Sequence, residues 1–159
     1  MTAQPLLDVS DLTVEFTTRR GIVKAVQHVN ISVGKGETVG IVGESGSGKS
    51  VTSYAVMRIL DRAGRIAEGS VMFSGIDVKA ATESQMRDLR GREVSMIFQN
   101  PRAALNPIRK VGHQIEDVLR QHVQQAQVTD RGETAIEALE QVKIARPRER
   151  YHAYPFELS

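Results

Sequence analysis

The 159-residue sequence contains no cysteine. This excludes a disulfide framework, a thiolate metal site and a cysteine nucleophile, and it is compatible with a reducing compartment without proving one. Aromatic residues make up 4% of the chain and are not interleaved with arginine and lysine, as a stacking surface for single-stranded nucleic acid requires. With 21 basic against 19 acidic residues, the net charge is only +2. The composition therefore predicts no nucleic-acid partner.

Long apolar runs are also missing. No stretch of about 18 apolar residues occurs, and the first residues lack the charged and apolar regions of a secretion signal. His113, His122 and His152 share no metal-ligand spacing, which favours surface or packing roles. We therefore expect a cytoplasmic chain, held at a membrane only if a partner holds it there.

The most informative segment is G-E-S-G-S-G-K-S at residues 43–50, which fills every fixed position of the pattern G-x-x-x-x-G-K-[ST]. Glycines at 43, 46 and 48 allow positive φ angles and a close approach of backbone N–H groups to phosphate oxygens. Lys49 can reach the β- and γ-phosphates, and the Ser50 hydroxyl can bind Mg²⁺ at a helix N-terminus that favours anions. The alternative is a glycine-rich turn that binds nothing. The predicted nucleotide site comprises Gly43, Glu44, Ser45, Gly46, Ser47, Gly48, Lys49 and Ser50.

The segments around this loop have recognisable periodicities. Residues 38–42 are apolar and β-branched, which predicts a buried parallel strand, and residues 51–60 predict a helix that ends at Ala63-Gly64. Alternation predicts antiparallel strands at 12–17 and 29–33, and a turn at 34–37 leads from the second of them into the strand that carries the loop. Further strands are expected at 70–74, before a turn at Gly75, and at 94–98. Thr82 and Gln85 predict a capping box for a helix that Gly91 ends.

The second half is predicted to be helical. One helix carries an apolar face formed by Val111, Ile115, Val118, Leu119 and His122. Asp130 and Glu133 predict the cap of another, with a face formed by Ala135, Ile136, Leu139 and Val142. The arginine-rich residues 143–150 are expected at the surface. The predicted division is a β-rich nucleotide-binding core at about 1–100 and a helical subdomain at about 101–159.

Motifs outside the loop narrow the class of protein. No Asn-Lys-x-Asp motif is present, which argues against a GTPase. Phe98-Gln99-Asn100-Pro101, about fifty residues past the loop, resembles the Q-loop of ATP-binding cassette (ABC) proteins, and residues 154–159 resemble the approach to their signature motif. The resemblance implies that Gln99 is a catalytic residue that approaches Mg²⁺ and the attacking water. The alternative for Gln99 is an ordinary polar residue at a strand end.

The resemblance extends to the N-terminus. It implies that Phe16 stacks on adenine, although Phe16 could instead be an ordinary core residue of its strand. Residues 43–50, 98–101 and Leu105-Asn106-Pro107 together resemble ATP-binding subunits of bacterial oligopeptide, dipeptide and nickel importers. The implied fold is an α/β P-loop NTPase of the ABC ATPase type, with an antiparallel β subdomain, an incomplete parallel core sheet and a helical subdomain.

The resemblance also implies an activity and partners. ATP and Mg²⁺ would be the cofactors, and hydrolysis would drive import of peptides or nickel. A second ATP-binding subunit, identical or not, would pair with this chain. Ser159 matches the signature serine, which in the family contacts the γ-phosphate bound by the opposite subunit. Permease subunits would hold the chain at the inner face of the cell membrane and connect it indirectly to a substrate-binding protein.

One motif of the family does not occur. A Walker B strand needs about four apolar residues that end in Asp, usually followed by Glu, and neither Leu6-Leu7-Asp8 nor Ile59-Leu60-Asp61 fits in length and position. We therefore expect the first part of a longer domain, arising from a truncated gene, a split gene or an expressed fragment, and inactive as an ATPase alone. The other interpretations are an inactive nucleotide-binding remnant and a soluble ABC ATPase of DNA repair or translation.

Overall fold

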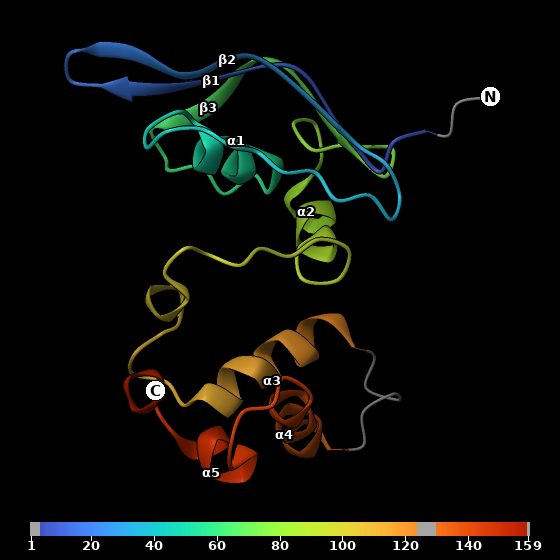
Figure 1. Cartoon of the computed structure of the whole chain (residues 1–159), viewed down its shortest axis with the longest axis vertical. Helices are drawn as coiled ribbons and strands as arrows, with labels where there is room; N and C mark the ends of the chain where they lie inside the picture. The colour runs from blue at the N-terminus through green and yellow to red at the C-terminus, as the bar shows by residue number, and fades with distance from the viewer. Residues whose placement is uncertain (1–3, 124–129, 159) are drawn as a thin grey trace. The chain divides into compact units, whose positions relative to one another are not determined.

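The computed structural model describes residues 4–123 and 130–158 and divides into two compact units, with the boundary between Arg90 and Gly91 (Figure 1). The first unit contains the sheet, two helices and the glycine-rich loop. The second unit is helical. Each is described by itself below.

The first unit is built on a four-stranded antiparallel sheet with strand order β2-β1-β3-β4. Its strands are β1 (Leu7–Thr18), β2 (Gly21–Val33), β3 (Gly64–Phe73) and β4 (Ile76–Asp77). The strands predicted at 12–17, 29–33 and 70–74 are confirmed, and each is longer than its pattern indicated. The turns at 34–37 and at Gly75 are confirmed as well. Apolar side chains of the central strand, including Val9, Leu12 and Val14, are almost fully buried.

Two helices follow the sheet strands, α1 (Lys49–Val56) and α2 (Glu83–Leu89). The predicted capping box of α2 is present: the Gln85 N–H donates to Thr82 Oγ1 at 3.2 Å, and the Thr82 N–H donates to Gln85 Oε1 at 2.8 Å. Ala55, Met86 and Leu89 are buried with the strand residues. The helices thus complete the core of the first unit.

Helix α1 ends earlier than predicted. The Ile59 N–H donates to the Tyr54 carbonyl at 2.9 Å and the Arg58 N–H to the Ala55 carbonyl at 3.0 Å, which is the hydrogen-bond pattern of a Schellman motif. Arg58 takes the left-handed position of that motif, with φ 49°. Glycine is the usual residue at this position, which is why the sequence pattern favoured Gly64 as the end of the helix. The predicted stop at Ala63-Gly64 is wrong, and Gly64 begins β3 instead.

The strands predicted at 38–42 and 94–98 are also wrong. Neither segment carries a strand assignment, apart from a single bridge between Val94 and Arg90. Val42 is 98% exposed and Ile97 is 92% exposed. The patterns were those of buried strands, but a strand forms only where a neighbour accepts its hydrogen bonds, and none of the described strands pairs with either segment.

The second unit contains η1 (Pro101–Ala104), α3 (Val111–His122), α4 (Arg131–Gln141), α5 (Pro147–His152) and η3 (Pro155–Glu157). Asp130 caps α4 as predicted, because its Oδ1 accepts from the N–H groups of Gly132 at 2.8 Å and Glu133 at 3.2 Å. Residues 143–150 are mostly exposed, as expected.

The core of this unit joins the three helices through Val111, Ala135, Leu139 and Tyr151. A Cβ on Gly112 would lie 2.1 Å from the Tyr151 ring, so only glycine permits this packing of α3 against α5. Two predicted face residues are exposed, Val118 at 52% and Val142 at 68%. Val142 follows the last turn of α4, which explains its exposure, whereas the described contacts give no reason for that of Val118.

Candidate nucleotide-binding site

The glycine-rich loop lies in the first unit, between residues 37–42, which belong to no strand or helix, and the N-terminus of α1. Gly46 and Gly48 have φ angles of +82° and +88°, which confirms the predicted need for glycine at both positions. Gly48 also packs against β2, since a Cβ there would lie 3.0 Å from the Ala25 carbonyl oxygen and from Val26 Cγ2. The loop is therefore anchored to the sheet through its last glycine.

The first glycine has a different role from the one predicted. Gly43 does not have a positive φ. A Cβ at this position would instead lie 2.6 Å from Ser47 Oγ and 3.8 Å from Lys49 Nζ. Glycine at 43 therefore leaves room for the Ser47 hydroxyl inside the loop, whereas the distance to Lys49 is an ordinary contact.

The Lys49 ammonium lies within the curve of the loop. It donates to the carbonyl oxygens of Gly43 and Glu44, both at 2.6 Å, and to Ser47 Oγ at 3.1 Å. The Ser47 N–H closes the turn by donating to the Glu44 carbonyl at 3.3 Å. Phosphate oxygens would have to replace part of this lysine coordination when an anion enters the loop.

The N-terminus of α1 is free to receive an anion. Its N-cap, Gly48, has no side chain to cap the first N–H groups, and the first turn contains no acidic residue. Such a terminus offers N–H donors and the positive end of the helix dipole. The loop residues 43–47 and Ser50 are exposed, and no hydrogen bond of the Ser50 hydroxyl is found among the described residues. One protein hydroxyl, phosphate oxygens and water form a suitable ligand set for Mg²⁺.

Two features support the loop that the sequence pattern did not indicate. Thr52 is buried in the first turn, where its Oγ1 donates to the Gly48 carbonyl at 3.0 Å. The Ala25 carbonyl and Val26 form the wall behind Gly48. A threonine that bonds four residues back is a recognisable helix feature, whereas the wall from β2 carries no sequence signal.

Phe16 lies in the same unit as the loop, on β1 opposite Val23 of β2 and Gly64 of β3. Its ring is half-buried and lies over Gly64, where a Cβ would be 2.7 Å from Phe16 Cε1. Val26, which contacts Gly48, is opposite Val14, two residues from Phe16 along β1. At about 3.3 Å per residue, Phe16 lies about 7 Å along the strand from that point. The structure therefore brings Phe16 and the loop to one region of the sheet.

Gln99 belongs to the second unit, so its predicted approach to Mg²⁺ stays a prediction. It is exposed and lies in a bend directly before η1. The neighbouring Asn100 caps η1, with its side-chain oxygen accepting from the Ala103 N–H at 3.4 Å. Ser159 lies outside the described residues.

A glycine-rich loop that leads into an uncapped helix N-terminus is the construction of a P-loop nucleotide-binding protein. The chain belongs to the ABC transporter family, whose sequence profile, described as "ABC transporter", matches residues 26–159. The described helices include none with the length and apolar character needed to cross a bilayer.

Curated relatives agree with this assignment. The chain is 44% identical over 155 residues to the oligopeptide transport ATP-binding protein OppD of Bacillus subtilis, covering 97% of this chain and 43% of that protein. It is 44% identical over 154 residues to the dipeptide transport ATP-binding protein DppD of Escherichia coli, covering 97% of this chain and 47% of that protein. The chain thus spans about half the length of the curated relatives it matches.

Solved structures confirm the fold. A dimeric bacterial ABC transporter cassette is similar with a TM-score of 0.81 at 23% identity, covering 96% of this chain and 63% of that one. A dimeric cassette in a post-hydrolysis state, bound to ADP and phosphate, has a TM-score of 0.77 at the same identity and coverage. The predicted ABC ATPase fold, with its antiparallel β subdomain and helices, is therefore confirmed. The predicted incomplete parallel core sheet is not formed among the described residues, whose strands all pair antiparallel.

Proposed function

We propose that the chain is the ATP-binding part of a peptide importer subunit and binds ATP with Mg²⁺ through residues 43–50. The observation that carries this proposal is the complete loop with the Lys49 ammonium at its centre, directly before the uncapped N-terminus of α1. Lys49 and the helix N-terminus neutralise phosphate charge, and Ser50 binds the metal. Phe16 contacts adenine, and Gln99 acts at the metal and the attacking water.

Peptides are the favoured cargo. The relatives named above are oligopeptide and dipeptide transport proteins, each 44% identical to this chain. This supports peptides over the nickel alternative and over an ATPase of DNA repair or translation. The nearly balanced charge of +2 also argues against a nucleic-acid partner.

The same comparisons support one of the proposed partners, a second ATP-binding subunit. A similar cassette forms a dimer, which supports pairing of this chain with a second ATP-binding subunit, identical or not. Permease subunits hold the pair at the cytoplasmic face of the membrane, and a substrate-binding protein acts with them from the other side.

The test is calorimetric titration of MgATP into the 159-residue chain and its Lys49→Ala variant. Loss of charge-assisted hydrogen bonds should cost about 2–3 kcal/mol, or roughly 30- to 150-fold in affinity. Lys35→Ala is the matched control, because Lys35 is an exposed lysine in the turn before the loop of the same unit. Equal affinities for wild type and Lys49→Ala would rule out the loop as the nucleotide site.

A further inference from the structure

The central strand β1 is irregular at residues 10–13, where its pairing with both β2 and β3 shifts register. Asp11 on β1 and His28 on β2 adopt left-handed φ angles of 53° and 51° at this point. On β3, a Cβ at Gly69 would lie only 2.3 Å from the Asp11 carbonyl oxygen. Three neighbouring strands therefore approach one another closely at a single bulge.

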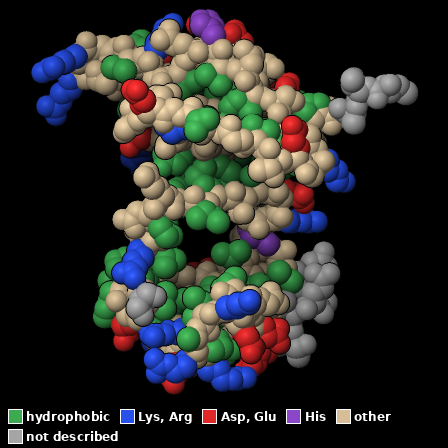
Figure 2. Space-filling model, viewed as in Figure 1, with side chains coloured by type: hydrophobic (Ala, Val, Ile, Leu, Met, Phe, Trp, Pro, Cys, Tyr) green, Lys and Arg blue, Asp and Glu red, His purple; other side chains and the backbone are tan. Residues whose placement is uncertain are grey.

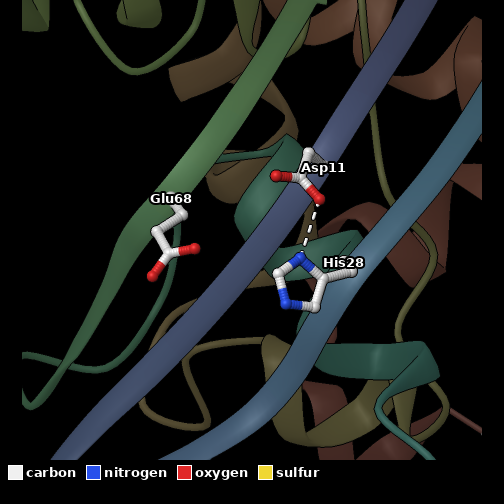
Figure 3. A group of neighbouring side chains, drawn as sticks. All are labelled: Asp11, His28 and Glu68. Atoms are coloured by element: carbon white, nitrogen blue, oxygen red, sulfur yellow. Dashed lines mark hydrogen bonds and ion pairs between the residues drawn. The ribbon is translucent and has the colours of Figure 1, made fainter.

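This bulge gathers three side chains that can bind a metal ion. Asp11, His28 and Glu68 come from β1, β2 and β3 and turn toward one another on one side of the sheet (Figure 3). One ligand atom of each lies within 4.8 Å of those of the other two. Asp11 Oδ1 and His28 Nδ1 are 2.8 Å apart.

The backbone around the cluster is held by its own hydrogen bonds. The Asp11 N–H donates to Asn30 Oδ1 at 2.9 Å, and Asn30 Nδ2 donates to the His28 carbonyl at 3.2 Å. The His28 N–H donates to Thr13 Oγ1 at 3.4 Å. The backbone positions of Asp11 and His28 are therefore fixed before any ligand arrives, which lowers the entropic cost of binding.

The charges of the cluster favour a cation. Two carboxylates face one imidazole, so the cluster is negative even if His28 is protonated. The Glu68 carboxylate makes no hydrogen bond or ion pair with any residue in the described ranges 4–123 and 130–158, which leaves it available as a ligand.

The donor atoms select the kind of cation. Mg²⁺ and Ca²⁺ bind to oxygen ligands, and Cu(I) binds to sulfur, whereas a mixture of imidazole nitrogen and carboxylate oxygen suits Zn²⁺ and its divalent neighbours. Tetrahedral Zn²⁺ with bonds of about 2.1 Å separates its ligand atoms by roughly 3.4 Å. Ligand atoms within 4.8 Å of one another would thus close in by up to about 1.4 Å, and Asp11 Oδ1 and His28 Nδ1, which are 2.8 Å apart, would separate by about 0.6 Å. Exposed side chains can make both changes by rotation.

We propose that Asp11, His28 and Glu68 bind a divalent transition metal ion such as Zn²⁺, with water in the remaining coordination positions. The site is separate from the glycine-rich loop and uses none of its residues. The ion would connect β1, β2 and β3 at the bulge and stabilise the sheet there, because a ligand that binds only the folded chain raises its stability.

The test is calorimetric titration of ZnCl₂ into the tag-free, metal-free chain without nucleotide. His28→Gly removes the imidazole and suits the left-handed backbone, and Glu68→Gln removes one exposed charge with little change of shape. Each variant should bind Zn²⁺ at least about tenfold more weakly than wild type. Asp88→Asn, an exposed acidic residue of the same unit, is the control and should bind like wild type.

Thermal unfolding gives a second measurement. Zn²⁺ should raise the midpoint of wild type and of Asp88→Asn, leave those of His28→Gly and Glu68→Gln nearly unchanged, and act far more strongly than Mg²⁺. Equal Zn²⁺ affinity in wild type and both cluster variants, or no Zn²⁺ binding by wild type, would overturn the proposal. Both outcomes are independent of ATP binding, so they leave the proposed function unaffected.

Discussion

At the scale of single residues, a substitution of Phe16 can distinguish a ring that stacks on adenine from one that only packs in the sheet. If its ring stacks on adenine, Phe16→Ala should weaken ATP binding by about 1–3 kcal/mol, the usual worth of base–aromatic stacking, and leave inorganic triphosphate unaffected. Calorimetry with both ligands measures the difference, and Phe156→Ala, which removes a 75% exposed ring from the second unit, is the control. Equal losses for ATP and triphosphate would mean that Phe16 only supports the sheet.

The loop residues were predictable because they are contiguous. The pattern spans eight consecutive positions, and its fixed residues at 48–50 are the types that binding to phosphate and Mg²⁺ requires. The role of Gly43 was not predictable, since it depends on where the Ser47 hydroxyl lies in three dimensions. Asp11, His28 and Glu68 were missed for a related reason: three strands bring together residues that are dispersed in the sequence.

At the scale of secondary-structure elements, Glu83 connects the C-terminal ends of α1 and α2 through Arg58 and Arg90. Its carboxylate accepts hydrogen bonds from Arg58 at 2.6 Å and from Arg90 at 3.0 Å. The Arg58 guanidinium also donates to the Val78 carbonyl, and that of Arg90 donates to the Met57 carbonyl. The hydrogen bonds from Arg58 and then Arg90 lower the pKa of Glu83 below its ordinary value of 4.5. The ionised form of the Glu83 carboxylate therefore stabilises the contact between the ends of α1 and α2.

This predicts a pH dependence of stability. Because the folded pKa is depressed, the contribution of Glu83 is complete above pH 4.5 and is lost as the pH falls through the lower folded pKa. Glu83→Gln should lower the unfolding midpoint at pH 7, and the gap to wild type should close as the pH falls toward 3. Thermal unfolding at a series of pH values measures it, with exposed Glu137→Gln as control. A gap that stays constant with pH would exclude the ionised carboxylate as the cause.

Elements with local signals were predicted well. The caps of α2 and α4 and the alternating strands of the antiparallel sheet are determined by nearby residues, and they occur where the patterns placed them. The segments at 38–42 and 94–98 have strand-like patterns without described strand partners. The end of α1 was misplaced because Arg58 takes a backbone position that sequence rules reserve for glycine.

At the scale of the whole molecule, we predict that the 159-residue chain binds MgATP without turnover. The loop and α1 supply phosphate binding, but no apolar run in the sequence ends in the Asp-Glu pair that would hold the metal and polarise water. Phosphate release should stay at the level of the Lys49→Ala variant. Mg²⁺-dependent turnover that this variant eliminates would show that another carboxylate of the chain acts in catalysis.

The strand order of the sheet has a consequence for the folding pathway. β1 and β2 form a local hairpin, whereas β1 and β3 join residues as distant as Leu7 and Phe73. Pairing over such a separation closes a long loop and is expected to follow the hairpin in time. The glycine-rich loop and α1 lie inside the segment that this pairing closes. The proposed nucleotide site is therefore expected to form late in folding, and nucleotide bound there is expected to slow unfolding without accelerating folding.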